Sequence, residues 1–193
     1  MQVIDLEIPG LKLIELNCFR DERGFFIERF NEAKFAEMGL PRKFVQDNHS
    51  LSQPGVLRGM HYQFNQPQGK LVSVIRGRVF DVAVDLRPSS ETFGEHFSVE
   101  LSAENNKLLW IPGGFAHGFC VLGSEPAEVL YKVDQLYNPR GEGGIVWNDT
   151  DLNISWPIRK PILSPKDKVQ PSFMAYKKSA LVKGDWHMPA LQL

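Results

Sequence analysis

The sequence predicts an all-β fold, a double-sheet jelly roll with a few short helices. Short runs of alternating apolar and polar residues recur along the chain, as in Phe80-Asp81-Val82-Ala83-Val84-Asp85 and again over residues 97–101. Glycines and prolines separate these runs, for example Pro112-Gly113-Gly114. Alternation with a period of two is typical of strands, and many short strands separated by turns are typical of a sandwich or barrel.

The first fifty residues combine strands with one helix. Residues 1–30 contain short strand-like segments, with a turn at Arg23-Gly24. Asn31 then provides a helix N-cap, and the predicted helix continues to Met38 before Gly39 and Pro41 end it. A strand over 44–50 follows, running into a polar edge.

The middle of the chain is predicted to be almost entirely strand. The predicted segments are 56–63, 71–74, 80–86, 97–101, 108–112, 115–119 and 129–133. Ser164 and Pro165 then begin a second short helix, in which Asp167 falls in the first turn. Nothing divides this pattern, so we predict one domain over residues 1–173 and a C-terminal tail over 174–193.

Composition excludes several classes of partner. The chain has 193 residues, a formal net charge of −1 and no basic stripe, so neither nucleic acid nor an anionic membrane is an expected partner. No apolar run is long enough to span a bilayer. The two cysteines, Cys18 and Cys120, lie in apolar segments, and no signal-like segment opens the chain. These features predict reduced thiols and a cytoplasmic location.

One stretch concentrates the reactive side chains. Arg58, His61 and Lys70 lie at the two ends of a polar connection between strand-like segments, so they could line one pocket. A histidine that carries a proton beside two fixed cations suits a substrate that is anionic or becomes so. The alternative interpretation is a loop histidine with solvated charges.

Phosphate loops and metal sites are not predicted. The sequence has neither a G-x-x-x-x-G-K-[ST] loop nor a G-x-G-x-x-G turn between a strand and a helix. His61 is followed by Tyr62 and Gln63, which could not complete a transition-metal site, and His117 would be a lone additional ligand. We therefore expect no metal and no cofactor.

Several motifs, in one order along the chain, resemble the dTDP-4-dehydrorhamnose 3,5-epimerase family. They are 21–26 (DERGFF), 46–50 (QDNHS), 56–63 (VLRGMHYQ), 68–72 (QGKLV), 80–85 (FDVAVD), 110–118 (WIPGGFAHG), 142–145 (EGGI), 147–149 (WND) and 163–167 (LSPKD). The resemblance extends from about residue 3 to about residue 170 and leaves only the tail outside. It implies a cupin-like jelly roll that is dimeric and free of metal.

The resemblance also implies a reaction and its catalytic residues. The family inverts C3 and C5 of dTDP-4-dehydro-6-deoxy-D-glucose to give dTDP-4-dehydro-β-L-rhamnose, in dTDP-L-rhamnose biosynthesis. By this resemblance His61 is the base, and Tyr131 is the acid on the opposite face of the sugar. Lys70 lies near the developing enolate oxygen, and Asp167 pairs with His61. From local sequence alone, the favoured interpretation of Tyr131 is a core residue and that of Asp167 is a capping residue.

Further residues are implied to bind the substrate. They are Arg23, Glu28, Gln46, Asp47, Asn48, Arg58, His117, Tyr137, Glu142 and Lys166. In the family pattern Tyr137 stacks on thymine, and Arg23 and Glu28 serve the neighbouring subunit of a homodimer. Arginine and lysine side chains would hold the diphosphate in place of a glycine loop.

Two other functions remain open at this point. One is a relative that epimerises a single carbon of a dTDP-4-keto-deoxysugar. The other is a non-catalytic carbohydrate-binding jelly roll, since this architecture has many functions. A binding module has no need for His61, Tyr131 and Asp167 together, which favours the enzyme.

Overall fold

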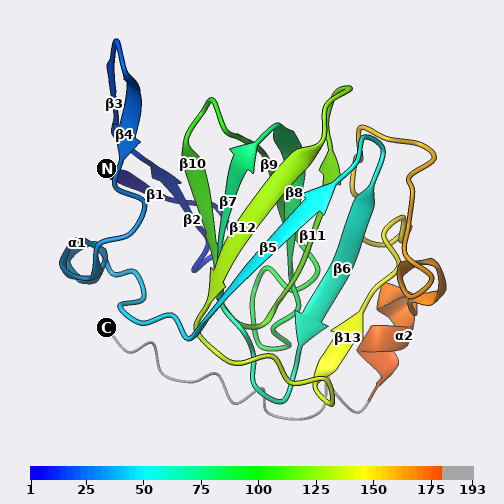
Figure 1. Cartoon of the computed structure of the whole chain (residues 1–193). Coiled ribbons are helices and arrows are strands. Elements are labelled where there is room, and N and C mark those ends of the chain that lie inside the picture. The colour runs from blue at the N-terminus through cyan, green and yellow to red at the C-terminus, as the bar shows by residue number, and fades with distance from the viewer. Residues whose placement is uncertain (180–193) are drawn as a thin grey trace.

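A computed structural model describes residues 1–179 and contains two antiparallel sheets that face each other (Figure 1). The larger sheet has the strand order β1 (Gln2–Asp5), β2 (Lys12–Glu15), β10 (Lys107–Ile111), β7 (Lys70–Arg76), β12 (Ala127–Val133) and β5 (Gln46–Ser52). The smaller sheet has the order β13 (Glu142–Gly144), β6 (Leu57–Gln63), β11 (Phe115–Val121), β8 (Arg78–Asp85) and β9 (His96–Ser102). The predicted all-β jelly roll is confirmed.

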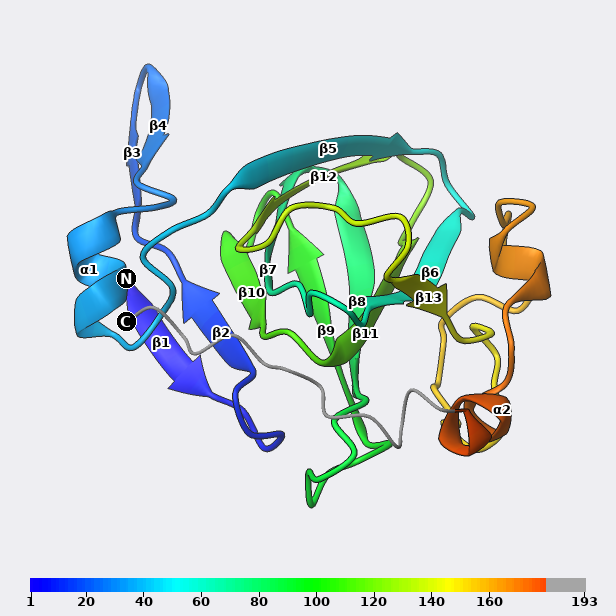
Figure 2. The ribbon, with the colours of Figure 1, turned by 90° about the horizontal axis from the view of Figure 1, so that it is seen from below.

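A separate hairpin and three short helical elements complete the described chain. Strands β3 (Cys18–Asp21) and β4 (Gly24–Ile27) pair only with each other and project from one end of the molecule (Figure 1). Helices α1 (Glu32–Glu37) and α2 (Phe173–Lys178) lie on opposite sides of the two sheets (Figure 2). The third element is the 3₁₀ turn η1 (Asp167–Val169).

The main core lies between the two sheets. Val72 and Val74 of β7 meet Val79, Leu101 and Phe119 from the smaller sheet, all of them buried. Full burial of such side chains typically contributes about 1.5–3 kcal/mol each, so this layer accounts for much of the hydrophobic stabilisation. It also fixes the separation of the sheets around the pocket described below.

Both sheets are covered on their outer faces as well. On β7 and β10 the alternate residues Leu71, Leu108 and Trp110 pack against a cluster that includes Phe35 of α1. On β8, Val82 and Val84 belong to a cluster that includes α2. The alternation of β8 therefore does not separate a buried face from a solvent face.

The predicted helix near residue 31 is confirmed, whereas the predicted second helix is only one turn. The side chain of Asn31 accepts a hydrogen bond from Lys34 N, which caps α1 as expected. At the second site the Ser164 hydroxyl accepts a hydrogen bond from Asp167 N at 3.1 Å, but only the 3₁₀ turn η1 forms. Pro171 lies two residues beyond η1 and cannot donate the backbone hydrogen bond that a longer helix needs.

The C-terminal part of the chain packs on the smaller sheet. Helix α2 buries Phe173 and Tyr176, and the Tyr176 hydroxyl donates to Leu86 O at 3.0 Å. This helix crosses the predicted boundary between residues 173 and 174. The division into domain and tail stays a prediction, and residues 180–193 of that tail lie outside the described residues.

Candidate active site

A pocket of about 280 Å³ opens between the two sheets. Three groups of residues line it, one from each sheet and one from the segment that contains η1. They are Arg58, His61, His117, Gly118, Phe119 and Glu142; His49, Ser50, Lys70 and Tyr131; and Ser164, Lys166 and Asp167. All four predicted catalytic residues are among them.

His61 and Asp167 form a hydrogen-bonded pair at one wall of this pocket. Nε2 of His61 lies 2.6 Å from Oδ1 of Asp167, and the two side chains are 32% and 3% exposed. Burial alone would raise the pKa of Asp167, but the hydrogen bond and charge of His61, with a smaller contribution from Ser164, leave this pKa below its usual value. Since a carboxylate only accepts hydrogen bonds, Nε2 carries the proton and Nδ1 is the basic nitrogen.

A second histidine pairs with a second aspartate on the neighbouring strands. Nε2 of His117 lies 2.9 and 3.0 Å from the two carboxylate oxygens of Asp81, and Asp81 is fully buried. His117 and His61 are direct partners in the antiparallel pairing of β11 and β6. Asp81 was not among the predicted site residues. The signal in the sequence is an acidic residue inside an apolar strand.

Two glycines allow the backbones of β6 and β11 to approach beside these histidines. Gly59 has φ of 118°, which L-residues with a side chain rarely adopt. A Cβ atom on Gly59 would lie 2.7 Å from Cα of Gly118, and one on Gly118 would lie 2.8 Å from the carbonyl oxygen of Arg58. No larger side chain fits at this position, which explains why a glycine follows Arg58 in strand β6.

Lys70 and Tyr131 enter the pocket from the larger sheet. Burial lowers the pKa of Lys70 from 10.5 to about 8, although the negative charges of Asp81 and Glu142 partly oppose this change. Burial also raises the pKa of Tyr131. Lys70 is therefore a cation below about pH 8, and Tyr131 is a neutral phenol that can donate a proton.

A chain of polar contacts extends from the pocket to its rim. Lys166 Nζ lies 2.5 Å from Oε1 of Glu142, and the hydroxyl of Tyr137 donates to Oε2 of the same carboxylate at 2.7 Å. The backbone N–H of Tyr137 donates to Oε1 of Gln46, and Gln46 Nε2 donates to Asn48 Oδ1. These five predicted binding residues therefore form one connected group along β5 and β13.

Arg58 is oriented by its neighbour on the edge strand. Its Nε donates to the hydroxyl of Ser52 at 2.9 Å, and Nη2 donates to Leu51 O at 3.3 Å. Ser52 is 1% exposed, so this contact holds the guanidinium group at a fixed place beside the pocket. The predicted residue Asp47 instead bonds Lys132 on the exposed side of β5 and does not line the pocket.

Comparison with known proteins identifies the family. The model of the dTDP-4-dehydrorhamnose 3,5-epimerase family matches residues 5–175. The chain belongs to this family. The resemblance in the sequence motifs is thereby confirmed.

Relatives within the family cover nearly the whole chain. A dTDP-4-dehydrorhamnose 3,5-epimerase from Shigella flexneri is 56% identical over 86% of this chain and 93% of its own length. The corresponding protein from Neisseria gonorrhoeae is 52% identical over 94% of this chain, which spans only 55% of the length of that relative. A "dTDP-4-dehydrorhamnose 3-epimerase" from Streptomyces niveus is 37% identical over 87% of this chain and 82% of its own length.

A solved structure in the family has the same fold. The dTDP-6-deoxy-D-glucose-3,5-epimerase from Legionella pneumophila, in complex with dTDP-4-keto-L-rhamnose, matches with a TM-score of 0.88 and 48% sequence identity. The match covers 94% of this chain and 96% of the Legionella chain.

Two residues that are predicted to bind the substrate, Arg23 and Glu28, lie away from the pocket. Arg23 is on the projecting β3–β4 hairpin, where its guanidinium group pairs with Asp21. Glu28 lies directly after β4, and its carboxylate pairs with Lys34 at 2.6 Å. Neither Arg23 nor Glu28 lines the pocket of its own chain.

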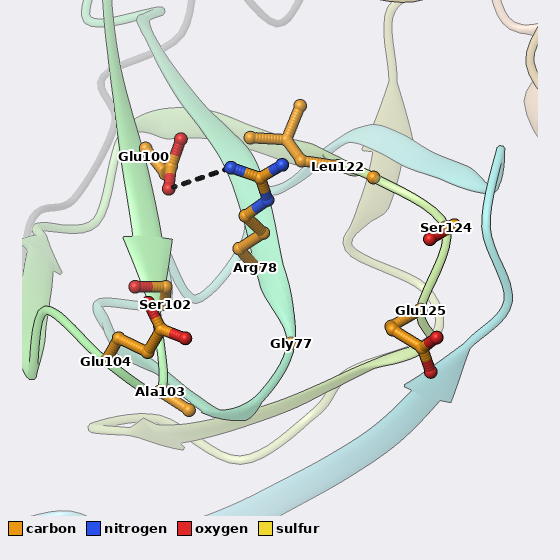
Figure 3. A pocket seen from close by; sticks show the side chains of 10 residues that line it. Gly77, Arg78, Glu100, Ser102, Ala103, Glu104, Leu122, Ser124 and Glu125 are labelled. Atoms are coloured by element: carbon orange, nitrogen blue, oxygen red, sulfur yellow. Dashed lines mark ion pairs between the residues drawn. The ribbon is translucent and has the colours of Figure 1, made fainter.

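A second pocket, of about 420 Å³, lies where β8 begins and β9 ends (Figure 3). Arg78 and Glu100 face each other there with 3.9 Å between Nη1 and Oε1, and Glu104 and Glu125 also line it (Figure 3). It is larger than the first pocket but contains no histidine, lysine or tyrosine. The chemistry predicted from the sequence belongs to the smaller pocket.

Neither a metal cluster nor a membrane-spanning helix occurs in the described part of the chain. No group of three or more His, Cys, Asp or Glu side chains within residues 1–179 could hold a metal ion. Over the same residues, no helix is long and apolar enough to cross a membrane.

Proposed function

We propose that this protein is an epimerase that inverts C3 and C5 of dTDP-4-dehydro-6-deoxy-D-glucose. The product would be dTDP-4-dehydro-β-L-rhamnose, an intermediate in dTDP-L-rhamnose biosynthesis. The observation that carries this proposal is the paired His61 and Asp167 on one side of a pocket whose other side contains Lys70 and Tyr131.

The reaction explains why a paired histidine is needed. C3 and C5 both flank the C4 ketone, so removal of either proton gives an enolate that the carbonyl oxygen stabilises. Nδ1 of His61 would accept the proton, because Nε2 is engaged by Asp167. The Asp167 carboxylate would then stabilise the imidazolium that forms, since its pKa is below the usual value and it stays ionised.

The larger sheet would supply the complementary groups. Lys70, charged below about pH 8, would stabilise the developing enolate oxygen in a partly buried site, where such contacts are strongest. Tyr131 would return a proton from the face opposite His61, because these residues belong to facing sheets. Delivery from the opposite face is what inverts the carbon.

The rim would hold the nucleotide. Arg58 and Lys166 supply positive charge for the diphosphate, and the exposed ring of Tyr137 is available to stack on thymine. The dTDP-sugar in the related Legionella structure supports this class of ligand. The reaction is a proton exchange without oxidation or reduction, so no cofactor is proposed.

Epimerisation of one carbon is the second candidate. It is favoured by the Streptomyces niveus relative, whose name specifies a 3-epimerase. A relative inverting both carbons is more similar, with 56% identity against 37%. We therefore place inversion at C3 and C5 first.

Deuterium exchange separates the two candidates. The protein would be incubated with dTDP-4-dehydro-6-deoxy-D-glucose in deuterated water, and deuterons at C3 and C5 would be counted by NMR. Incorporation and inversion at both carbons is the expected result. Incorporation at one carbon would identify the single-carbon enzyme, and incorporation at neither would contradict epimerisation.

We further propose a homodimer in which each subunit completes the other's pocket. Phe19, Phe25 and Phe26 of the β3–β4 hairpin are 62–68% exposed, and such clustered apolar side chains typically mark an interface. Arg23 lies on this hairpin, so docking against a second copy would bring a cation to the partner's pocket. Without a partner, Arg23 has no role in binding.

A cytoplasmic location is part of the proposal. Cys18 and Cys120 are both free thiols, and burial raises the pKa of Cys120 to about 11. Such a thiol is protonated and unreactive at neutral pH. Both cysteines therefore suit a reducing compartment.

A further inference from the structure

The hydroxyl of Ser50 is buried without a hydrogen-bond partner. Across residues 1–179 only two side-chain atoms have this property, Ser50 Oγ and Gln170 Nε2. Ser50 lines the candidate active site, whereas Gln170 does not. An unpaired buried polar group is destabilising, so its presence in a folded protein calls for an explanation such as an absent ligand.

The neighbours of Ser50 on the same strand all have partners. In β5 the alternate residues Gln46, Asn48, Ser50 and Ser52 share one face. Gln46 donates to Asn48, and Ser52 accepts from Arg58. Ser50 alone in this row has an unused hydroxyl. Its unpaired state is therefore specific to this position and is not a property of the whole strand.

Strand pairing places Ser50 on the same wall as two proposed catalytic residues. Asn48 is opposite Tyr131 in the β5–β12 register, and Ser50 is opposite Val129. Directly opposite residues of an antiparallel pair share a face, and diagonal neighbours lie within reach of a long side chain. Lys70 shares the face too, because it is opposite Val133, two residues beyond Tyr131 on β12.

We infer that Ser50 is a substrate-binding residue whose hydroxyl forms a hydrogen bond with an oxygen atom of the hexose. A hydroxyl can both donate and accept, so it suits a carbonyl, an enolate or a sugar hydroxyl. The sugar is favoured over the thymine because Tyr137, the proposed stacking residue, bonds Gln46 at the other end of β5. This inference rests on the proposed function, because that function puts a dTDP-linked hexose in the pocket.

The Ser50→Ala variant tests the inference through two opposing measurements. Loss of one hydrogen bond to the substrate should lower kcat/KM about 10- to 100-fold. The thermal unfolding midpoint should stay the same or rise, because the variant removes an unpaired buried group. A residue with only a structural role would give a lower midpoint with unchanged kcat/KM, and this result would overturn the inference.

Ser73→Ala is the matched control on the same sheet. Ser73 is 6% exposed, and its hydroxyl donates to Leu130 O at 2.9 Å. This variant loses a satisfied hydrogen bond outside the pocket. Its unfolding midpoint should fall, and its kcat/KM should equal that of the wild type.

Calorimetry distinguishes a sugar contact from a phosphate contact. Ser50→Ala should bind dTDP with the wild-type Kd but bind dTDP-L-rhamnose about 10-fold more weakly. Equal weakening for both ligands would assign the hydroxyl to the diphosphate and overturn the inference, as would unchanged affinity for both. Because calorimetry needs no turnover, it tests Ser50 even if the wild-type protein fails to exchange deuterium, a result that would contradict only the proposed function.

Discussion

Two histidine–aspartate pairs lie at the pocket, and they differ mainly in the exposure of the histidine. His61 and His117 are opposite each other on paired strands, and each directs Nε2 toward a carboxylate. The His61 side chain is 32% exposed, however, whereas His117 is 9% exposed and its partner Asp81 is fully buried. Both histidines line the pocket, but His61 is the more accessible of the two.

This difference indicates different roles for similar pairs. A base must reach its proton and must gain and lose charge in every turnover, so it needs an accessible nitrogen. An enclosed histidine is better suited to holding one ligand group in place. Asp81 also contributes negative charge toward Lys70, which links the enclosed pair to the proposed enolate site.

Replacing each histidine with asparagine should give the largest contrast. His61→Asn removes the base, so deuterium exchange at both carbons should fall about 10⁴-fold. His117→Asn should weaken substrate binding while exchange stays measurable. NMR of the recovered substrate provides the measurement, and equal loss of exchange in both variants would mean that the two histidines share one role.

Replacing Asp167 should lower kcat more than replacing Asp81. Asp167→Asn keeps an acceptor for His61 but removes the charge that stabilises its imidazolium, so kcat should fall about 10³-fold. Asp81→Asn should lower kcat by less, because His117 is not proposed to change charge during turnover. Steady-state kinetics at saturating substrate would compare them. The proposal would be wrong if Asp81→Asn had the larger effect.

Tyr131→Phe should separate exchange from inversion. The ring stays against the core, but the proposed acid on the far face is lost. Deuterium should still enter the substrate from the His61 side, while formation of the epimerised product falls about 10²-fold. Product analysis and exchange would be measured in one sample. Equal loss of both signals would exclude Tyr131 as a face-specific acid.

Replacing Arg23, which belongs to neither histidine–aspartate pair, should have a smaller effect. If the hairpin serves a partner's pocket, Arg23→Ala should weaken dTDP binding by about 1.5–3 kcal/mol and leave the fold intact. Isothermal calorimetry would measure the change. Arg42→Ala is a matched control, because Arg42 is an exposed cation that pairs with Glu32 of α1 and does not line the pocket. Wild-type affinity in Arg23→Ala would argue against the shared site.

The smallest expected effect is a shift in the pH profile. Lys70 is a cation below its pKa of about 8, so kcat should fall as the pH rises through this value. The negative charge of Asp81 raises the pKa of Lys70. Removing this charge in Asp81→Asn should therefore move the fall in kcat to lower pH. In Asp167→Asn the fall in kcat should occur at the same pH as in the wild type. An unchanged pH profile in Asp81→Asn would show that the charge of Asp81 does not affect the pKa of Lys70.

Local patterns in the sequence predicted most of the strands and the first helix, but the second predicted helix is only the 3₁₀ turn η1, and α2 was not predicted. Alternating residues identified the strands, and Asn31 identified the start of α1, because side-chain direction and helix capping depend on near neighbours. The shared motifs identified the family, and the resemblance to it pointed to the pocket residues His61, Lys70 and Tyr131. Element ends were less certain: the strand predicted over 44–50 is β5 (Gln46–Ser52).

The partners of these residues were decided only by the tertiary structure. Local sequence favoured a capping role for Asp167, but its backbone N–H bonds Ser164 while its carboxylate bonds His61, 106 residues away. Asp81 is an ordinary polar position in an alternating strand until β11 places His117 beside it. Ser50 likewise is recognised as a candidate binding residue only in the structure, where its hydroxyl is buried and unpaired. The physical reason is that period and capping are local, whereas strand order and sheet packing bring together residues distant in sequence and decide which polar groups meet.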